Sequence, residues 1–213
     1  IEEVLYGAME EQALDIIVGK GPSARTMRMP IEPFTLIGAT TKPHLISTPL
    51  RDRFGHVYHL GYYSPDEMSQ IVSRSAGVLS IEIEKEATNL IAQRARRTPR
   101  IANRLLKRVR DYAQVHGSGI ITLQLTQLAC SLLRIDEQGL DDVDRKVLRT
   151  IISTFSGGPV GLRTLAAACA EDLDTIETMI EPYLIQIGYL DRTGRGRVTT
   201  ERAQEHLSRI DTR

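Results

Sequence analysis

The first part of the chain, residues 1–61, alternates apolar and polar side chains in two places. Apolar residues take every second position in 14–18 and again in 27–31, on either side of the Gly- and Pro-containing segment Gly19–Ser23. This period of two predicts a β-hairpin with a long tip. The apolar run Phe34–Ile37 predicts a strand buried on both faces of a parallel sheet. A single strand and a hairpin cannot make a sheet domain, so this block predicts the end of a larger α/β domain.

Residues 62–136 change to helical spacing. Ser64–Glu67 has the pattern of a capping box, with proline at the first helical position, and Thr98-Pro99 marks another helix start. The apolar positions that predict four helices are Met68, Ile71 and Val72; Ala87, Leu90 and Ile91; Ile101, Leu105, Val109, Tyr112 and Ala113; and Leu125, Leu128, Ala129 and Leu132. Four short helices with brief connections predict a small bundle.

A polar joint, Asp136–Asp142, leads into the third block, which runs to Arg213. Three helices are predicted here by the apolar sets Val143, Val147, Leu148 and Ile151; Leu162, Leu165 and Ala166; and Ile176, Met179, Ile180, Tyr183 and Leu184. Asp174 is expected to cap the third helix and Gly188 to end it. A hairpin with its turn at Asp191–Gly196 completes the parts of a winged helix-turn-helix.

Bulk composition excludes more than it identifies. The 213 residues include 41% hydrophobic ones, enough for a real core, and 27 charges of each sign, so net charge indicates neither nucleic acid nor a membrane surface. No apolar run approaches the ~18 residues of a membrane span. The two cysteines, Cys130 and Cys169, lie in apolar helical contexts and predict a reduced cytoplasmic protein. The five histidines have no ligand spacing, so no metal site is expected.

The most informative chemistry lies in Gly38–Lys42 and Pro49–Phe54. Small hydroxyl residues end the predicted strand, where parallel sheets bind ligands, and Arg51 and Arg53 flank Asp52. Such a pattern is typical of an oligomeric nucleotide-driven motor that senses the terminal phosphate and lends a cation to its neighbour, an effect of roughly 10³-fold or more. No G-x-x-x-x-G-K-[ST] phosphate loop occurs in the chain, and no acidic pair follows an apolar strand ahead of these residues.

Several long ungapped stretches resemble one family. They are Gly19–Arg25, Phe34–Thr41, Pro49–Gly55, Thr98–Leu106, Arg108–Ala113 and Glu181–Gln186. Together they resemble RuvB, the bacterial AAA+ ATPase that drives Holliday-junction branch migration in recombination and repair. The resemblance implies an α/β plus α fold: the C-terminal part of an AAA+ large domain at 1–61, a helical lid bundle at 62–136 and a winged-helix DNA-binding domain at 137–213.

The family also implies a hexameric ring around duplex DNA that works with RuvA in the cytoplasm and hydrolyses ATP with Mg²⁺. The complete protein would be an ATP-dependent helicase or translocase. We expect the isolated chain not to hydrolyse ATP, because no phosphate loop is present. Two other readings stay open: a non-catalytic winged-helix DNA-binding or scaffold module, and another AAA+ protein such as a clamp loader or an initiator.

The resemblance assigns roles around the nucleotide. Thr41 is the first sensor, Arg53 the arginine finger that acts on a neighbouring subunit, and Arg100 the second sensor. Tyr63 and the stretch Glu10-Glu11-Gln12 match residues near bound nucleotide. Each role has a structural alternative. Thr41 could cap a turn with its hydroxyl, Arg53 could belong to a surface ion cluster, and Arg100 could lie on a solvated helix face. Tyr63 could be a core tyrosine, and Glu10-Glu11-Gln12 a solvated helix end. Family members usually carry Gly where this chain has Arg97.

Two surfaces are implied for partners. The hairpin at 14–31 would dock RuvA, with packing inside the ring as the alternative. Its Gly19-Lys20-Gly21 is not read as a phosphate loop, because no helix follows and Pro22 lacks an N–H. In the third block, Arg192, Arg195 and Arg197 lie on a glycine-rich hairpin that can approach a DNA backbone without reading sequence. Winged domains also bind proteins, so that reading remains the alternative.

Overall fold

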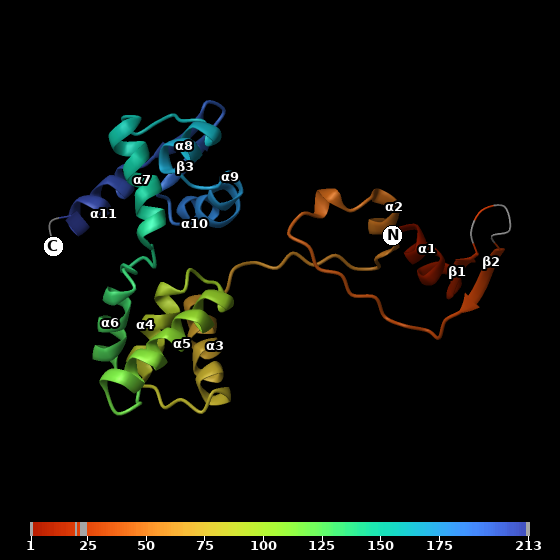
Figure 1. Cartoon of the computed structure of the whole chain (residues 1–213), viewed down its shortest axis with the longest axis horizontal. Helices are drawn as coiled ribbons and strands as arrows, with labels where there is room; N and C mark the ends of the chain where they lie inside the picture. The colour runs from red at the N-terminus through yellow and green to blue at the C-terminus, as the bar shows by residue number, and fades with distance from the viewer. Residues whose placement is uncertain (1, 20, 22–24, 212–213) are drawn as a thin grey trace. The chain divides into compact units, whose positions relative to one another are not determined.

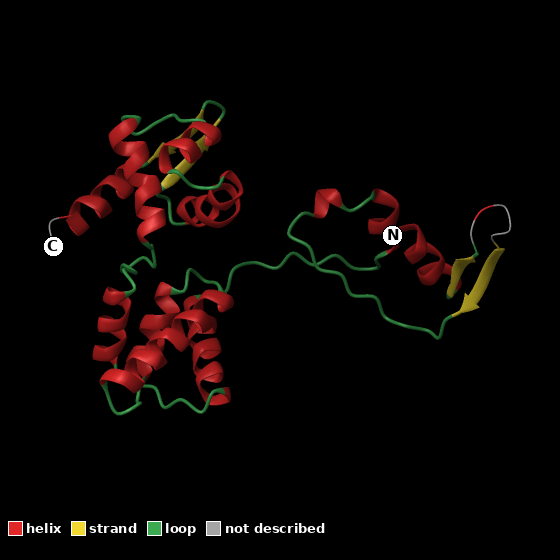
Figure 2. Cartoon of the chain, viewed as in Figure 1, coloured by secondary structure: helices red, strands yellow, loops and turns green. Residues whose placement is uncertain are grey.

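A computed structural model gives the fold of residues 2–19, 21 and 25–211 (Figures 1 and 2). The chain divides into two compact units, one up to Gly61 and one from Tyr62 onward. The first unit contains helix α1 (Glu2–Glu11), strands β1 (Ala13–Val18) and β2 (Arg25–Pro30), a short 3-10 turn η2 (Pro43–Leu45) and helix α2 (Thr48–Arg53). Across the described residues the structure is mostly helical with two small sheets, which confirms the predicted mixed α/β plus α class.

The predicted hairpin in the first unit is present. Strands β1 and β2 pair antiparallel from Ala13 opposite Pro30 to Val18 opposite Arg25. The backbone N–H of Ile31 donates to the Gln12 carbonyl at 2.7 Å and extends the pairing by one bond. The predicted tip includes Lys20 and residues 22–24, which lie outside the described residues.

The expected buried strand Phe34–Ile37 is wrong for this structure. Residues 31–40 have no regular secondary structure, and the Ile37 side chain is 87% exposed. Among the described residues of this unit, the two strands pair only with each other, and Phe34–Ile37 is not paired with either of them. A short apolar run becomes a strand only when a partner strand satisfies its backbone groups.

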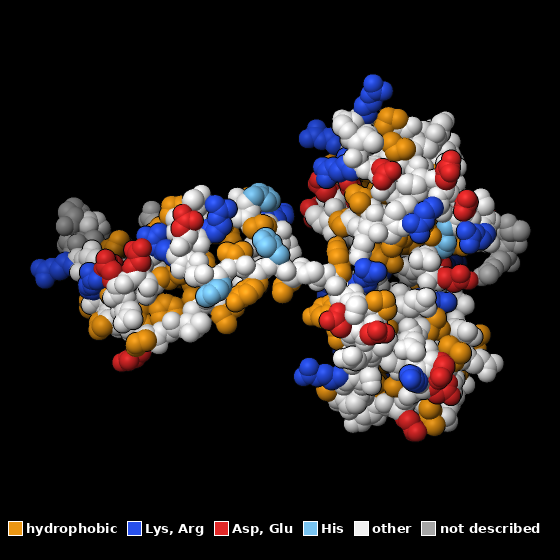
Figure 3. All heavy atoms as spheres, turned by 180° about the vertical axis from the view of Figure 1, so that it is seen from behind, with side chains coloured by type: hydrophobic (Ala, Val, Ile, Leu, Met, Phe, Trp, Pro, Cys, Tyr) orange, Lys and Arg blue, Asp and Glu red, His pale blue; other side chains and the backbone are white. Residues whose placement is uncertain are grey.

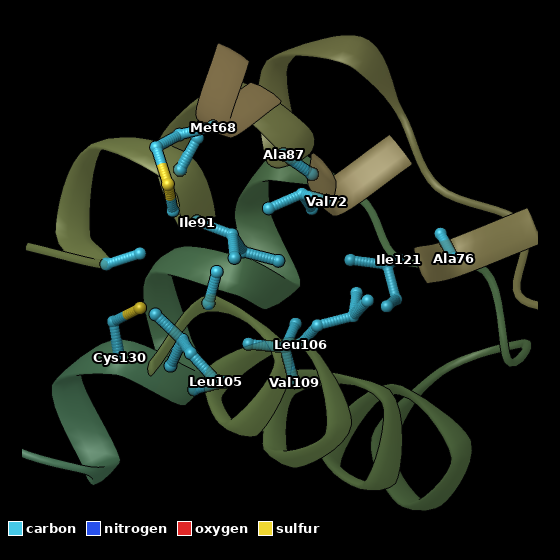
Figure 4. Packing of buried hydrophobic residues seen from close by; sticks show 14 of the residues in the cluster. Met68, Val72, Ala76, Ala87, Ile91, Leu105, Leu106, Val109, Ile121 and Cys130 are labelled. Atoms are coloured by element: carbon cyan, nitrogen blue, oxygen red, sulfur yellow. The ribbon is translucent and has the colours of Figure 1, made fainter. Parts of the chain in front are cut away.

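The second unit begins with the predicted four-helix bundle: α3 (Pro65–Val78), α4 (Lys85–Arg94), α5 (Pro99–His116) and α6 (Leu123–Leu132). The Ser64 capping box is confirmed, because the Ser64 hydroxyl accepts from Glu67 N at 3.3 Å and the Glu67 carboxylate accepts from Ser64 N at 2.7 Å. Figure 4 shows side chains of this bundle meeting in one core, among them Met68, Ile91 and Leu106 from the helices and Ile121 from the connection between α5 and α6.

A second core follows in the same unit. Its elements are α7 (Asp142–Thr154), α8 (Leu162–Cys169), α9 (Leu173–Thr175), the π-helical turn η3 (Ile176–Ile180), α10 (Glu181–Gln186), strands β3 (Leu190–Thr193) and β4 (Gly196–Thr199), and α11 (Glu201–Asp211). One expectation was wrong here, and one helix was not predicted. The helix cap is Asp172, whose carboxylate accepts from Thr175 N, and not Asp174. Helix α11 was not predicted, although Ala203 and Leu207 bury one face of it.

The hairpin of this module, here called the wing, is tighter than expected. Strands β3 and β4 pair from Leu190 opposite Thr199 to Thr193 opposite Gly196, so the turn holds only two residues. Val160 adds a bridge to Arg197 on the other edge of β4. A Cβ on Gly196 would lie 2.4 Å from the Val160 carbonyl oxygen, so glycine is required where the wing meets this third segment.

Candidate functional site

The candidate sensor Thr41 lies in an exposed loop of the first unit. The neighbouring hydroxyl of Thr40 accepts a hydrogen bond from Lys42 N at 3.0 Å and closes a local turn, which is the structural role considered for this stretch. Thr41 itself is exposed and does not follow a strand. Its hydroxyl is therefore available to a ligand, but no sheet edge within the described residues orients it.

Arg53 occupies the end of helix α2, which Ser47 starts by accepting a hydrogen bond from Leu50 N. Its guanidinium donates to the Pro49 carbonyl at 2.7 Å, pairs with the Glu10 carboxylate at 2.9 Å and lies over the Tyr6 ring at 4.4 Å. The Arg53 side chain is 25% exposed. To act on a neighbouring copy, this group would first have to leave Glu10 and Tyr6.

The structure thus brings two candidate residues together, because Glu10 belongs to the stretch Glu10–Gln12. Glu11 is engaged separately in an ion pair with Arg28 of β2. Gln12 has a positive φ of 49° and turns the chain from α1 into the hairpin. All three are exposed at a helix end, and two of them already have charged partners inside this unit.

Arg100 lies in the first turn of helix α5 in the second unit. Its side chain is exposed, and no ion pair or hydrogen bond is found for it among the residues that the structure describes. Arg97, three residues earlier, has a φ of +52°. Glycine adopts this left-handed conformation freely, so the departure from the family pattern places an arginine on a backbone suited to glycine.

Tyr63 is 44% exposed and directly precedes the cap of helix α3. It is therefore not the core tyrosine considered as the alternative. Its ring and hydroxyl are free to meet a ligand beside the first turn of this helix. The expectation that Tyr63 lies beside bound nucleotide stays a prediction.

The three wing arginines do not form one surface. Arg192 and Arg195 are exposed, and Arg192 makes only long contacts of 3.7 Å with Glu177 and Glu181. Arg197 is buried, and its guanidinium donates twice to Glu181, at 3.0 and 2.8 Å. This corrects the expectation that Arg197 contacts DNA, because a buried, paired guanidinium fixes the base of the wing and cannot reach a phosphate.

The β1–β2 hairpin exposes apolar side chains. These are Ile16, Ile17, Val18, Met27 and Met29, each at least 38% exposed. Hydrophobic side chains are visible on this unit in Figure 3, and elsewhere on the drawn face lysine and arginine side chains are interspersed with acidic ones. Flexible methionines among branched apolar residues suit a protein contact better than a nucleic-acid contact.

Within the described part of the chain, no group of three or more His, Cys, Asp or Glu side chains is arranged to hold a metal ion. Across the same residues, no helix has the length and apolar character needed to cross a membrane. A hollow of about 570 Å³ does lie in the second unit, lined by residues of α3, α4, α10 and α11. Arg96 and Arg97 line it, whereas Arg100 and Tyr63 do not.

One buried polar cluster was not predicted from the sequence. Arg96, in the turn after α4, donates to Gly139 and to both carboxylate oxygens of Asp144 at the start of α7. Burial raises the pKa of Asp144 to about 6, and the Arg96 guanidinium opposes that rise. The available signal was Asp141 followed three residues later by Asp144, a helix-start pattern that predicts where Asp144 lies but not its partner.

Three family profiles match the chain in order. Residues 1–60 match the Holliday junction DNA helicase RuvB P-loop domain, residues 63–136 the RuvB AAA lid domain, and residues 137–208 the RuvB C-terminal winged helix domain. The chain is 58% identical over 207 residues to the Holliday junction branch migration complex subunit RuvB of Chloroflexus aurantiacus. This match covers 97% of the chain and 59% of that relative.

Solved structures give the same result. A Thermotoga maritima RuvB, described as a Holliday junction branch migration motor, has a TM-score of 0.79 and 44% identity, covering 97% of this chain and 64% of that one. A variant of the same protein has a TM-score of 0.80 at 45% identity, covering 97% and 65%. These matches confirm the predicted resemblance, and the chain belongs to the RuvB family.

Proposed function

We propose that this chain forms part of an ATP-driven motor subunit that moves the branch point of Holliday junctions. The observation that carries the proposal is the match over 97% of the chain to a relative named as a branch migration complex subunit. The chain spans 59% of that relative's length, so the activity belongs to the full-length protein that contains this chain. The same proposal includes ATP and Mg²⁺ as cofactors, RuvA and duplex DNA as partners, a hexameric ring as the assembly, and the cytoplasm as the location.

We divide the chain at 61/62 and 136/137 into the end of the AAA+ large domain, the lid and the winged helix. In this scheme Mg²⁺–ATP supplies the phosphoryl group and its developing charge. Arg100 and Tyr63 bear on the nucleotide of their own subunit, and Thr41 orients the terminal phosphate or the attacking water. Exposed, uncompensated cations such as Arg100 are what a phosphate needs, since a guanidinium can pair with two of its oxygens.

Arg53 is proposed to act on the neighbouring subunit after exchanging Glu10 for phosphate. Mixing full-length Arg53→Ala subunits with parent subunits should lower ATP hydrolysis by more than the dilution, because each altered subunit silences its neighbour's site. Arg51→Ala is the matched control: it removes an exposed arginine of the same helix and should have a smaller effect. Loss only in proportion to dilution would exclude a role across subunits.

The motor reading is separated from a DNA-binding scaffold by a junction assay. Full-length protein with RuvA should convert a synthetic four-way junction into two duplexes only when Mg²⁺–ATP is present. Junction binding without ATP-dependent movement would favour the scaffold.

The same assay tests the hairpin as the contact for RuvA. Junction movement that persists after the apolar residues Ile17 and Met27 are both changed to Ser would exclude the hairpin as that contact.

The wing is proposed to contact the DNA backbone through Arg192 and Arg195. Each phosphate contact contributes about 0.9 to the slope of log affinity against log salt. Arg192→Ala and Arg195→Ala should therefore each reduce that slope by roughly 0.9. Arg209→Ala, which removes an exposed arginine of α11, is the control and should leave the slope unchanged. Unchanged slopes for both wing variants would assign the wing to a protein partner.

A further inference from the structure

Arg96 connects the lid to the winged-helix module by several contacts at once. Its Nε donates to the Gly139 carbonyl at 2.7 Å, one Nη donates to an Asp144 carboxylate oxygen at 3.2 Å, and the other Nη contacts the second oxygen. The guanidinium also lies 5.2 Å from the centre of the Tyr183 ring. The side chains of Arg96 and Asp144 are only 12% and 1% exposed. Such a two-pronged pair fixes orientation as well as distance.

Asp144 passes this constraint to helix α7. It is the third residue of that helix, and its carboxylate also accepts from the backbone N–H of Asp141 at 2.8 Å. Asp141 in turn accepts from the N–H groups of Val143 and Asp144. Movement of the Arg96 guanidinium is therefore transmitted directly to the first turn of α7, whose apolar face lies in the second core.

On the lid side, Arg96 is held by the turn that starts helix α5. Arg96 and Arg97 both have a φ of +52°, and the Arg96 carbonyl accepts from the Thr98 hydroxyl at 3.0 Å. Helix α5 begins at Pro99, so Arg100 lies four residues from Arg96. Arg96, which contacts the winged-helix module, and Arg100, which is proposed to sense the nucleotide, therefore lie close together in sequence. A short turn with a restricted backbone conformation connects them.

The chain between the two modules is also held by polar contacts. Arg145 donates to the carbonyls of Leu140 and Arg134 at 2.7 and 2.6 Å, and Asp136 accepts from Gln138 N and Leu140 N at 2.9 Å each. Gly139, with a φ of +74°, approaches so closely that a Cβ there would lie 2.4 Å from the Arg94 carbonyl oxygen. This segment is fixed in place and does not act as a flexible linker.

We propose that Arg96 is a positioning residue that couples the lid to the winged helix, so that the two move together when the nucleotide state of the lid changes. The contact geometry stands by itself, whereas the use of this coupling in moving DNA rests on the proposed function. Without Arg96, Asp144 would be a buried carboxylate that lacks its main counter-charge, and the joint would lose its fixed orientation.

The coupling is tested by measuring the distance between spin labels on the two modules in the full chain. Labels at Glu86→Cys on α4 and Arg163→Cys on α8 occupy exposed helix positions, and the native Cys130 and Cys169 are buried and should not label. The parent should give one narrow distance distribution. Arg96→Ala should broaden it at least twofold, and Arg96→Lys, which keeps the charge but not the two-pronged geometry, should broaden it less.

Arg108→Ala, which removes an exposed arginine from α5, is the matched control and should leave the distribution unchanged. If Arg96→Ala does not fold, Arg96→Lys and Asp144→Asn test the same contact from its two sides. An unchanged narrow distribution in the folded variants would overturn the proposal.

The functional consequence is read in the full-length protein with RuvA and a four-way junction. Arg96→Lys should raise the ATP consumed per base pair of branch movement several-fold while leaving the affinity for DNA alone unchanged. A merely stabilising role would leave this ratio unchanged, and that result would overturn the coupling even if the distances broaden. If no junction movement is seen in the parent either, the proposed function fails while the distance measurement still decides the coupling.

Discussion

The left-handed backbone at Arg97 shows how much conformational strain one position can hold. A residue with a Cβ pays about 1 kcal/mol or more for this conformation, whereas glycine adopts it freely but loses more entropy on folding. At Arg97, where φ is +52°, these two effects nearly cancel if the arginine is replaced by glycine. The position therefore tolerates glycine in a way that a helical position does not.

Arg97→Gly should change the free energy of unfolding by less than about 0.5 kcal/mol, since relief of the left-handed strain offsets the entropy loss. Arg104→Gly is the control, because it places glycine at an exposed position inside helix α5 and should destabilise by about 1 kcal/mol. Urea unfolding monitored by circular dichroism measures both. Equal destabilisation by the two substitutions would show that the left-handed backbone at Arg97 gives glycine no advantage over a helical position.

The wing is anchored to the rest of its module by a buried ion pair. Arg197 on β4 and Glu181 on α10 are both buried and paired, so the strand is fixed to the helix by charge inside an apolar module. The other carboxylate oxygen of Glu181 is buried without a hydrogen bond, and Arg192 lies 3.7 Å from it. Removing one member of a buried ion pair destabilises a protein far more than replacing both members with apolar side chains.

Arg197→Ala should therefore destabilise the module by about 3–5 kcal/mol, because it leaves the Glu181 carboxylate buried without its partner. Arg195→Ala removes an exposed wing arginine and should change stability by less than about 0.5 kcal/mol. Thermal unfolding compares the two. A loss at Arg197 no larger than at Arg195 would mean that water or Arg192 compensates Glu181.

The start of helix α7 predicts a distinct pH dependence. Because burial raises the pKa of Asp144 from 3.8 to about 6, the folded chain keeps a proton there that the unfolded chain has released. The contribution of this carboxyl to stability is therefore complete below about pH 4 and is lost as the pH rises through 6. Between these values, parent stability relative to Asp144→Asn should fall by up to about 1.4 kcal/mol per pH unit.

Urea unfolding of the parent and Asp144→Asn between pH 4 and 8 gives this difference directly. Asp142 and Glu67, whose pKa values are lowered by hydrogen bonds from Arg145 and Ser64 respectively, are present in both proteins and cancel. A difference that increases with pH would have the opposite sign. It would mean that the attraction of Arg96 outweighs burial at Asp144.

The two compact units are joined by exposed chain. Tyr58 and Leu60 are 79% and 94% exposed, and no regular secondary structure is found between Phe54 and Ser64. Backbone that is exposed and irregular is the preferred site of proteolytic cutting. The helices that follow bury their apolar side chains in two closed cores.

Brief digestion with chymotrypsin should therefore cut within residues 54–63 well before it cuts the second unit, because aromatic and leucine side chains are accessible there. Tyr112, which lies within helix α5, and Tyr189, which is buried just before β3, are internal controls and should be cut much later. Mass spectrometry of the first fragments identifies the sites. First cuts within 65–211 would contradict the compactness of the second unit.

Local patterns predicted the helices and hairpins because their signals act over a few residues. The Ser64–Glu67 capping box and the period of two in β1 and β2 are examples. The Phe34–Ile37 strand failed because a strand depends on a partner that the pattern does not contain. Helix α11 was missed because Ala203 and Leu207 are too sparse a stripe to stand out from its charged residues.

Candidate residues were predictable by type more than by environment. Arg192, Arg195 and Arg197 look alike along the sequence, and only packing separates the buried Arg197 from the other two. The ion pair of Arg53 with Glu10 joins residues that are 43 apart, and that of Arg96 with Asp144 joins residues 48 apart. Sequence spacing carries no signal for such pairs, because the fold alone brings them together.

The two thiols, Cys130 and Cys169, are enclosed in different cores, one in the lid and one in the winged-helix module. Burial also raises the pKa of Cys130, which keeps its reactive thiolate scarce. Alkylation of each cysteine therefore requires its own module to open. The alkylation rates of Cys130 and Cys169 therefore report how often each module opens. Equal rates across solution conditions would mean that the lid and the winged helix open as one cooperative unit.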